Sequence, residues 1–502
     1  MRRLLPFARA PVAFPALVLA ALVLAAPPLA AAERTLTFGR MGKVTLYSEK
    51  EQPAHVVLFV SGDGGWNLGV VDMARQLATR DSLVVGVDIT HYLKSLAAGS
   101  ESCSYPAADF EALSKFVQQS LGFTSYTIPV LVGYSSGATL VYATLAQAPE
   151  NTFAGALSLG FCPDLPLTRP LCKGSGLRFT AGPQGHGYIF LPSANLPAPW
   201  TALQGQVDRV CNPAEVDRFG RDTHPAEVIP LPKVGHGFSV TKNWMPEFSQ
   251  AFDRLVARGA TATPGAATQP AAATQPATAA QPSAAGPSPA ATDGALDLAS
   301  LPLVEVRAHR PGGDTLAVIL TGDGGWAGFD KEVADALADS PMDVVGLNSL
   351  QYYWKPRTPD GAARDLERIV RHYLAAWGRE RLLLIGYSFG ADVLPFLTAR
   401  LPDDLRARVR LVTLVSPSLK AGFAFHIGGW LGREDPDAVP ILPEMARLAG
   451  LRVLCLAGKK EEDSLCRVAQ PPAVNTELLS GGHHLGGDYS GVAARILKAA
   501  GG

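Results

Sequence analysis

Short apolar runs alternate with amphipathic stretches along most of the chain, and the alternation occurs in two separate halves. The runs predicted as strands in the first half are 56–60, 83–87, 130–133, 154–160, 201–204 and 226–231. Those predicted in the second half are 316–320, 343–347, 382–386, 409–415, 451–456 and 476–479. Most are continuous in Val, Ile and Leu, which is typical of strands covered on both faces. Because helical stretches such as 71–78 and 365–377 lie between them, we expect two tandem α/β domains, each a mostly parallel sheet with helices on both faces.

A segment of different composition separates the two halves. Residues 261–293 are almost all Ala, Thr, Pro, Gln, Ser and Gly. Such a segment buries too little apolar surface to offset its ordering entropy, so it is typical of a solvated linker. We therefore predict a first domain over 33–257, a linker over 258–295 and a second domain over 296–502.

The N-terminus has the pattern of a targeting segment. Arg2, Arg3 and Arg9 precede an apolar stretch at 16–26, and small residues at 30–32 suit a cleavage site. The apolar stretch is short for a membrane span. We therefore predict a signal peptide over 1–32 that is cleaved on export, with an uncleaved membrane anchor as the alternative.

Composition and cysteine count narrow the possible functions. The net charge is −1, and no basic cluster stands outside the N-terminus, so we expect no nucleic-acid partner. The cysteines number four in the first half and two in the second, and even numbers in an exported chain suit disulfides. Our preferred pairs are Cys162–Cys172 and Cys455–Cys466, although four cysteines allow three connectivities. Zinc is the alternative, but no CxxC or HxxxH spacing supports it, and we expect no metal.

Two short motifs recur once in each half. Gly-Asp-Gly-Gly-Trp occupies 62–66 and 322–326, and Gly-Tyr-Ser-x-Gly occupies 133–137 and 386–390. The repetition indicates two copies of one domain. Gly-x-Ser-x-Gly between a buried strand and a helix is the nucleophile elbow of α/β-hydrolases, so Ser135 and Ser388 are the predicted nucleophiles.

A serine nucleophile needs a base and an acid, which in this fold follow it in the order Ser, Asp/Glu, His. The first half supplies Asp208 and His236. The second supplies Asp463, which lies three positions before a cysteine as Asp208 does, and His483. Counting from the preceding glycine favours Glu461 instead of Asp463, and His484 is the rival of His483.

The Gly-Asp-Gly-Gly-Trp loop follows an early strand, where this fold places one of its two oxyanion-hole donors. The predicted donors are the backbone N–H groups after each nucleophile and those of the paired loop glycines, namely Ser136, Phe389, Gly64, Gly65, Gly324 and Gly325. Asp63 and Asp323 fit turn residues better than catalytic acids. Because the loop lacks the lysine of a Walker motif and GxGxxG is not matched, we expect no nucleotide and no cofactor.

Longer strings in the second half carry a family resemblance. They lie at 321–326, 347–359, 386–396 and 481–489. On these strings the chain resembles the bacterial virulence protein family VirJ/AcvB, in its two-domain AcvB-like form. The resemblance implies a periplasmic α/β-hydrolase acting on aminoacyl phospholipid, chiefly lysyl-phosphatidylglycerol, and a link to type IV secretion. The alternatives are a non-catalytic adaptor for secretion and an esterase of another lipid or cell-wall ester.

Residues near the predicted second site suggest how such a substrate would bind. Asp392 could pair with an ammonium, although a carboxylate is favourable in a helix's first turn anyway. Tyr352, Tyr353 and Trp354 follow a strand's carboxyl end and could form an aromatic wall, meet a membrane, or simply pack. The first half lacks these strings, so it is either a second hydrolase or a binding domain, and Ser388 is the predicted main nucleophile.

Overall fold

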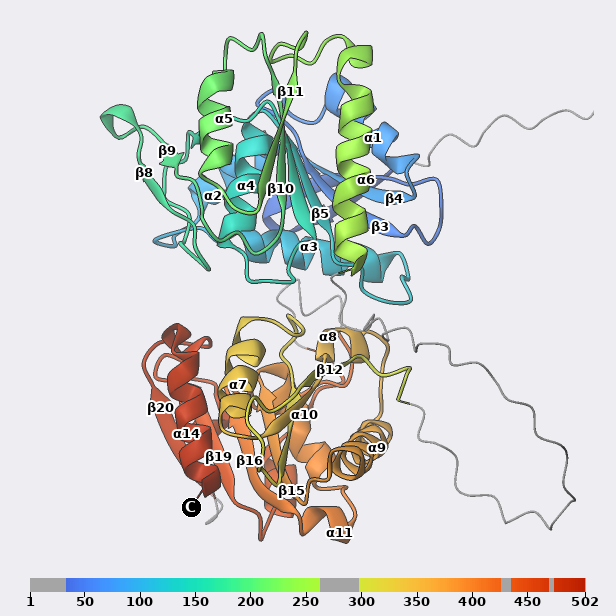
Figure 1. Cartoon of the computed structure of the whole chain (residues 1–502), viewed down its shortest axis with the longest axis vertical. Helices are drawn as coiled ribbons and strands as arrows, with labels where there is room; N and C mark the ends of the chain where they lie inside the picture. Colours follow the sequence, from blue (N-terminus) through green and yellow to red (C-terminus); the bar gives the residue numbers. More distant parts are fainter. Residues whose placement is uncertain (1–32, 262–297, 426–434, 469–473, 502) are drawn as a thin grey trace, which may run out of the picture.

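The computed structural model describes residues 33–261, 298–425, 435–468 and 474–501, which form two α/β domains (Figure 1). The predicted signal peptide and most of the predicted linker lie outside these residues. In the part of the chain described, no helix is long and apolar enough to cross a membrane.

The first domain is built on an eight-stranded sheet in the order β1-β2-β4-β3-β5-β6-β10-β11. Its strands are β1 (Arg34–Phe38), β2 (Gly42–Tyr47), β3 (His55–Val60), β4 (Ser82–Val87), β5 (Val130–Tyr134), β6 (Gly155–Leu159), β10 (Trp200–Gly205) and β11 (Ala226–Leu231). The strands from β4 to β11 are parallel, and β2 runs antiparallel to β1 and β4. One face packs on α1 (Leu68–Ala78) and α6 (Met245–Thr261). The other packs on α2 (Ile89–Ala98), α3 (Pro106–Ser120), α4 (Ser136–Gln147) and α5 (Pro213–Arg221).

The second domain repeats this plan with seven strands in the order β12-β14-β13-β15-β16-β19-β20. The strands are β12 (Leu303–Val306), β13 (Thr315–Leu320), β14 (Asp343–Leu347), β15 (Arg381–Tyr387), β16 (Val409–Val415), β19 (Val453–Gly458) and β20 (Val474–Leu479). Only β12 pairs antiparallel in this sheet. Helices α7 (Gly328–Asp339) and α14 (Tyr489–Gly501) cover one face, and α9 (Pro359–Trp377) and α10 (Phe389–Thr398) cover the other. Short helices α8 (Ser349–Tyr352), α11 (Asp403–Arg406) and α13 (Leu442–Arg447) lie in its connections.

The predicted fold class is confirmed, and each of the twelve predicted strands is present within a few residues of its expected bounds. The antiparallel strands β1, β2 and β12, which lie at one side of each sheet, were not predicted, because polar residues interrupt their apolar positions and no continuous apolar run marks them. Two small sheets were also missed. They consist of β7 (Asp164–Leu165), β8 (Phe179–Ala181) and β9 (Tyr188–Phe190), and of β17 (Lys420–Ala421) and β18 (Val439–Pro440).

Three disulfides are present, and the preferred pairing in the first domain is wrong. Cys103 bonds to Cys172 and Cys162 to Cys211, whereas Cys455 bonds to Cys466 as predicted. Cys162 follows β6 and Cys211 follows β10, and these strands are parallel neighbours. Their carboxyl ends therefore lie side by side, which brings together two cysteines far apart in sequence.

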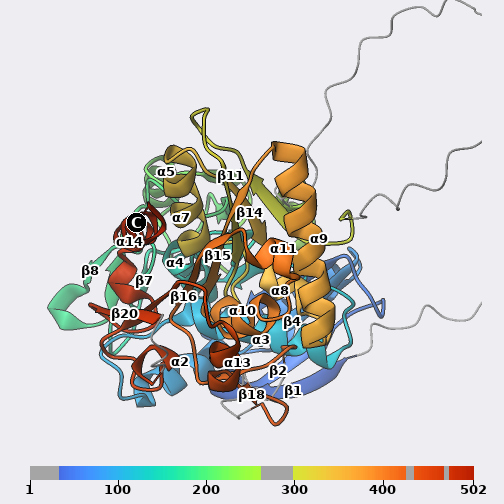
Figure 2. The ribbon, with the colours of Figure 1, turned by 90° about the horizontal axis from the view of Figure 1, so that it is seen from below.

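The two domains contact each other through α3 of the first and α8 of the second, which lie together in both views (Figures 1 and 2). Leu350 and Trp354 belong to the apolar core of the first domain. The indole N–H of Trp354 donates to the carbonyl of Phe123 at 2.8 Å. Since α8 follows the carboxyl end of β14, the carboxyl ends of the parallel strands in the second sheet face the first domain.

We expect replacement of both Cys162 and Cys211 by Ala to lower the free energy of unfolding of the first domain by about 4 kcal/mol, from the closure entropy of the loop. The Cys455–Cys466 bridge closes a shorter loop. Its loss should therefore lower the free energy of unfolding of the second domain by about 3 kcal/mol. Urea titrations that resolve the two domain transitions would measure both values. An unchanged first transition in the Cys162/Cys211 variant would show that this bridge does not stabilise the domain.

Candidate active sites

The nucleophile elbow of the first domain is the turn from β5 into α4. Ser135 adopts φ 56° and ψ −123°, a strained conformation for a residue with a side chain. A Cβ on Gly133 would lie 2.2 Å from the carbonyl oxygen of Gly137, and one on Gly137 would lie 2.4 Å from that of Val60. The motif therefore needs glycine on both sides of the serine so that helix and strands can approach.

The second domain has the same turn from β15 into α10. Ser388 adopts φ 52° and ψ −119°. A Cβ on Gly390 would lie 2.1 Å from the carbonyl oxygen of Leu320. In both elbows the residue after the serine begins a helix, where the backbone N–H has no carbonyl partner within the helix. The N–H groups of Ser136 and Phe389 therefore have the placement expected of oxyanion donors.

The first domain brings Ser135, His236 and Asp208 into one hydrogen-bonded chain. Ser135 Oγ lies 2.9 Å from His236 Nε2, and His236 Nδ1 lies 2.9 Å from Asp208 Oδ2. Asp208 is buried, and its Oδ1 accepts from the backbone N–H groups of Val210 and Cys211 at 2.8 and 3.0 Å. These bonds hold the carboxylate toward the imidazole, which is the arrangement of a serine hydrolase triad.

The second domain assembles the same chain with Glu461 as its acid. Ser388 Oγ lies 2.8 Å from His483 Nε2, and His483 Nδ1 lies 2.7 Å from Glu461 Oε1. The prediction of Asp463 is therefore corrected, since the side chain of Asp463 is exposed. The physical reason is that β19 ends at Gly458 and the chain turns at once. Glu461 thus stands three positions after the strand, as Asp208 does after Gly205.

Ser416 is a member of the second site that the sequence did not indicate. Its Oγ lies 3.0 Å from Glu461 Oε2 and 2.8 Å from the carbonyl oxygen of His483. The backbone N–H of Gly458 also donates to Glu461 Oε2, at 2.6 Å. Ser416 directly follows the buried strand β16, and a polar residue at the carboxyl end of a central strand is the signal that could have found it.

The rival histidine, His484, has a different role. Its Nδ1 lies 2.8 Å from the hydroxyl of Tyr387. Burial, together with the neighbouring His483, lowers the pKa of His484 below its ordinary value. His484 thus packs beside the site against Tyr387, and His483 occupies the position of the base.

The Gly-Asp-Gly-Gly-Trp loop lies directly against the nucleophile in each domain. A Cβ on Gly62 would lie 3.1 Å from Ser135 Cβ, and one on Gly322 would lie 3.4 Å from Ser388 Cβ. One part of the oxyanion prediction is corrected. The N–H groups of Gly65 and Gly325 close the turn by donating to the carbonyls of Gly62 and Gly322, at 2.9 and 3.1 Å. Gly64 and Gly324 remain the predicted loop donors that this turn does not use.

The predicted substrate residues lie in the core instead of along an open wall. Tyr352, Tyr353 and Trp354 are all buried, and Tyr353 packs its ring against Phe389 at 5.0 Å. Asp392 is buried too, and its Oδ1 accepts from the N–H of Ser418 at 2.6 Å. Of the three roles expected for Tyr352, Tyr353 and Trp354, the geometry supports packing.

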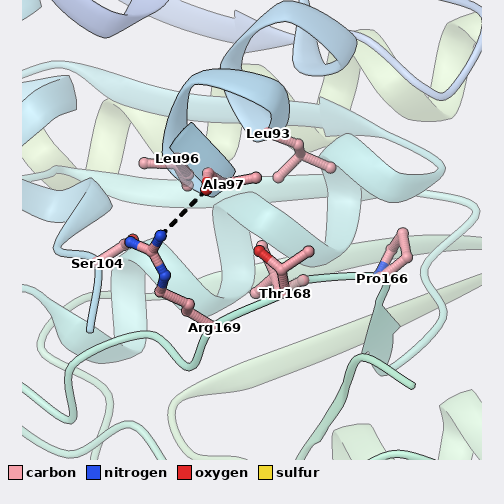
Figure 3. Close-up of a pocket in the computed structure, with 8 residues that line it drawn as sticks. Leu93, Leu96, Ala97, Ser104, Pro166, Thr168 and Arg169 are labelled. Carbon is pink, nitrogen blue, oxygen red and sulfur yellow. Dashed lines mark hydrogen bonds between the residues drawn. The ribbon is translucent and has the colours of Figure 1, made fainter. Parts of the chain in front are cut away.

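Among the hollows that the described residues form, two lie in the first domain. The larger, of about 320 Å³, adjoins the oxyanion loop at Gly62 and Gly64 and is lined by apolar side chains such as Met73 and Trp244 and by polar ones such as Asn67 and Asp72. The smaller, of about 30 Å³, lies between α2 and residues 166–169, where Arg169 donates to the carbonyl of Ala97 at 3.2 Å (Figure 3). It has room for little more than a water molecule, so of these two hollows the larger is the one that could take part of a substrate.

One group of described residues has the spacing of a metal site. Ligand atoms of Asp208, Cys211 and His236 lie within 4.8 Å of one another. Cys211 is joined to Cys162 in a disulfide, so its sulfur is not the thiolate that zinc binds. The other two residues already bond to each other within the triad. The geometry thus fits a triad better than a metal centre.

Comparison with known proteins gives a family match. The family model described as bacterial virulence protein (VirJ) matches residues 54–158 and 314–501, more than half of the chain. No curated protein matches.

Similar solved structures include several esterases. The esterase domain of a Rhodothermus marinus protein is 17% identical over 44% of this chain and 98% of that one, with a TM-score of 0.31. Est1E from Butyrivibrio proteoclasticus is 12% identical over 40% and 94%, with a TM-score of 0.31. Esterase 2 from Thermogutta terrifontis is 17% identical over 46% and 95%, with a TM-score of 0.31.

The position of the second acid can be tested with two amide substitutions. In a Ser135→Ala background, Glu461→Gln should lower kcat on p-nitrophenyl acetate by about 10³-fold or more, because the imidazolium loses its carboxylate. Asp463→Asn should stay within about twofold of its parent, since its carboxylate is exposed. The reverse ranking of the two variants would restore Asp463 as the acid.

Asp392 should make the second domain less stable as pH rises. Burial raises the pKa of this carboxyl from 3.8 to about 8. The folded state therefore retains a proton that the unfolded state releases, and the free energy of unfolding falls between about pH 4 and 8, by at most about 1.4 kcal/mol per pH unit. Asp392→Asn keeps the acceptor for Ser418 and should remove this part of the slope. Urea unfolding at pH 5 to 8 would measure it, and an unchanged slope in the variant would refute the assignment.

Proposed function

Because the chain belongs to the VirJ family of bacterial virulence proteins, we propose that it is a periplasmic serine hydrolase that cleaves the aminoacyl ester of lysyl-phosphatidylglycerol. The observation that carries the proposal is the hydrogen-bonded chain from Ser388 through His483 to Glu461 in the domain that the family model matches over 314–501. The fold and the two triads make the chain a serine hydrolase of the α/β-hydrolase superfamily.

The geometry supports acyl transfer in two steps. His483 Nε2 accepts the proton of Ser388 Oγ as the oxygen attacks the ester carbonyl carbon. The N–H groups of Phe389 and Gly324 stabilise the oxyanion. His483 then passes the proton to the departing glycerol oxygen of the lipid, which leaves lysine esterified to Ser388. Water, deprotonated by the same imidazole, attacks this ester and releases free lysine and the serine hydroxyl.

A cationic acyl group suits the charges near the second site. Glu461 is engaged by His483, Asp392 is buried, and the carboxylate of Asp323 lies 3.8 Å from the ammonium of Lys115. Glu462, beside the acid, is exposed and could pair with an ammonium of the lysyl group. This carboxylate supports an aminoacyl substrate over a neutral fatty-acyl ester.

The second domain is proposed as the main catalyst. The first stretch of the family match, 54–158, includes Ser135 but ends before Asp208 and His236. The first triad is nevertheless complete and adjoins the larger hollow, so we propose that it hydrolyses a second ester.

Export and partners are part of the proposal. Three disulfides suit an oxidising compartment, and the N-terminal segment has the pattern of a signal peptide. The family's link to virulence supports contacts with secretion-system proteins.

Ser388→Ala should abolish the release of lysine from lysyl-phosphatidylglycerol in vesicles, because Ser388 carries the hydroxyl that His483 Nε2 contacts. The matched Ser135→Ala variant should retain most of the activity. Lysine release measured by mass spectrometry tests both. Full activity in Ser388→Ala would refute the proposed site, and activity on neutral esters alone in the unaltered chain would refute the substrate.

A further inference from the structure

The oxyanion loop of the second domain is held by residues of the first domain. Lys115 on α3 donates from Nζ to the backbone carbonyl of Asp323 at 2.9 Å, and Nζ lies 3.8 Å from the carboxylate of the same residue. Asn151, in the loop between α4 and β6, donates from Nδ2 to the carbonyl of Trp326 at 2.7 Å. Both ends of the loop at 323–326 are therefore bonded across the domain boundary.

In the first domain the same loop is tied from within. The hydroxyl of Ser136 donates to the carboxylate of Asp63 at 2.6 Å, and the side-chain amide of Asn67 donates to the carbonyl of Gly64 at 2.6 Å. Ser136 is the residue after the nucleophile, and Asn67 is the residue after the tryptophan of the loop motif. Two side chains of the same domain thus fix the loop against the nucleophile.

The second domain lacks both of these donors. Phe389 stands in the place of Ser136, and Ala327 stands in the place of Asn67. Neither side chain has a polar atom. The backbone of Ala327, at φ −137° and ψ −167°, closely follows that of Asn67, at φ −153° and ψ 171°. The loop has therefore kept its shape while its internal ties have been replaced by Lys115 and Asn151.

The bond from Lys115 reaches the peptide group that carries a predicted oxyanion donor. The carbonyl of Asp323 and the N–H of Gly324 belong to one peptide unit, which is planar and trans. Fixing the oxygen toward Lys115 therefore fixes the N–H on the opposite side of that unit. A charged donor on the oxygen also polarises the peptide and strengthens its N–H as a hydrogen-bond donor.

The burial and the charged neighbours of Lys115 favour this contact. Its side chain is only 5% exposed, and its ammonium lies 2.8 Å from Glu111 on the same helix. Burial alone would lower the pKa of Lys115, but the carboxylates of Glu111 and Asp323 raise it above its ordinary value. The ammonium is thus charged, neutralised on its own domain and aimed at the loop of the other.

We propose that the first domain completes the active site of the second, with Lys115 and Asn151 as positioning residues that hold its oxyanion loop. The inference rests on the proposed function in one respect, namely that Ser388 is a working nucleophile. It gives the first domain a role at the second site whatever ester its own triad hydrolyses.

A fluorophosphonate probe tests this in the full chain, since the labelling rates of Ser135 and Ser388 can be read from separate peptides of the same molecule. We expect Lys115→Met to slow the labelling of Ser388 by about 10-fold to 100-fold, below the loss expected for a deleted oxyanion donor. The labelling of Ser135 should stay within about twofold. In a Ser135→Ala background, the same variant should lower kcat on p-nitrophenyl acetate and leave KM near its original value.

Three further variants separate positioning from general destabilisation. Lys331→Met removes an exposed pair with Glu150 at the same interface and should leave both rates unchanged. Asn151→Gly keeps the positive φ of 64° and loses only the amide, so it should slow Ser388 even if Lys115→Met folds poorly. Ala327→Asn, added to Lys115→Met, should restore much of the rate by recreating the tie that Asn67 makes.

Each contrary result has one meaning. Equal Ser388 rates in the unaltered chain and in both Lys115→Met and Asn151→Gly would overturn the inference alone. A parallel fall of the Ser135 and Ser388 rates would also overturn it, because a positioning role is confined to the second site. A Ser388 that does not react in the unaltered chain would overturn the proposed function and the inference with it.

Discussion

Both active sites depend on one steric constraint, the close approach of the nucleophile turn to the loop of the neighbouring strand. Gly137 and Gly390 pass so close to the carbonyls of the adjacent strand that a side chain on either would overlap them. The approach forces Ser135 and Ser388 into positive φ and presses each against its oxyanion loop. The strain is offset by the packing of a buried parallel sheet, so the reactive geometry exists only because the surrounding core is complete.

That constraint acts on the backbone, which explains why the two copies could diverge in side chains and keep their shape. The contact between the copies is heterologous, since the strand ends of the second sheet face the first domain near the start of its β5. Only the second site therefore gains a neighbour. Phe389 and Ala327 stand in the second copy where Ser136 and Asn67 fix the loop in the first, and Lys115 on α3 bonds to the loop instead.

The sequence predicted the features that depend on the order of residues along the chain. It did not predict the features that depend on which segments are neighbours in space. Continuous apolar runs predicted the central strands, and the order Ser, acid, His predicted the position of His483. The acid was misplaced because the count started from Cys466, whereas the reach of a side chain depends on where β19 ends. The pairing of Cys162 with Cys211 depends on the adjacency of β6 and β10, which the separation of the two cysteines does not reveal.

Trp354 and Lys115 show the same limit across the domain boundary. In the sequence, an aromatic residue after a strand suggests part of a binding site. Trp354 is instead buried, because the first domain lies on it. A lysine within a helix reads as a solvated charge, yet Lys115 is held between Glu111 and Asp323. Burying an ammonium is costly unless it is paired, and removing one partner leaves the other uncompensated. The paired ammonium therefore links the docking of the two domains to the position of the second oxyanion loop.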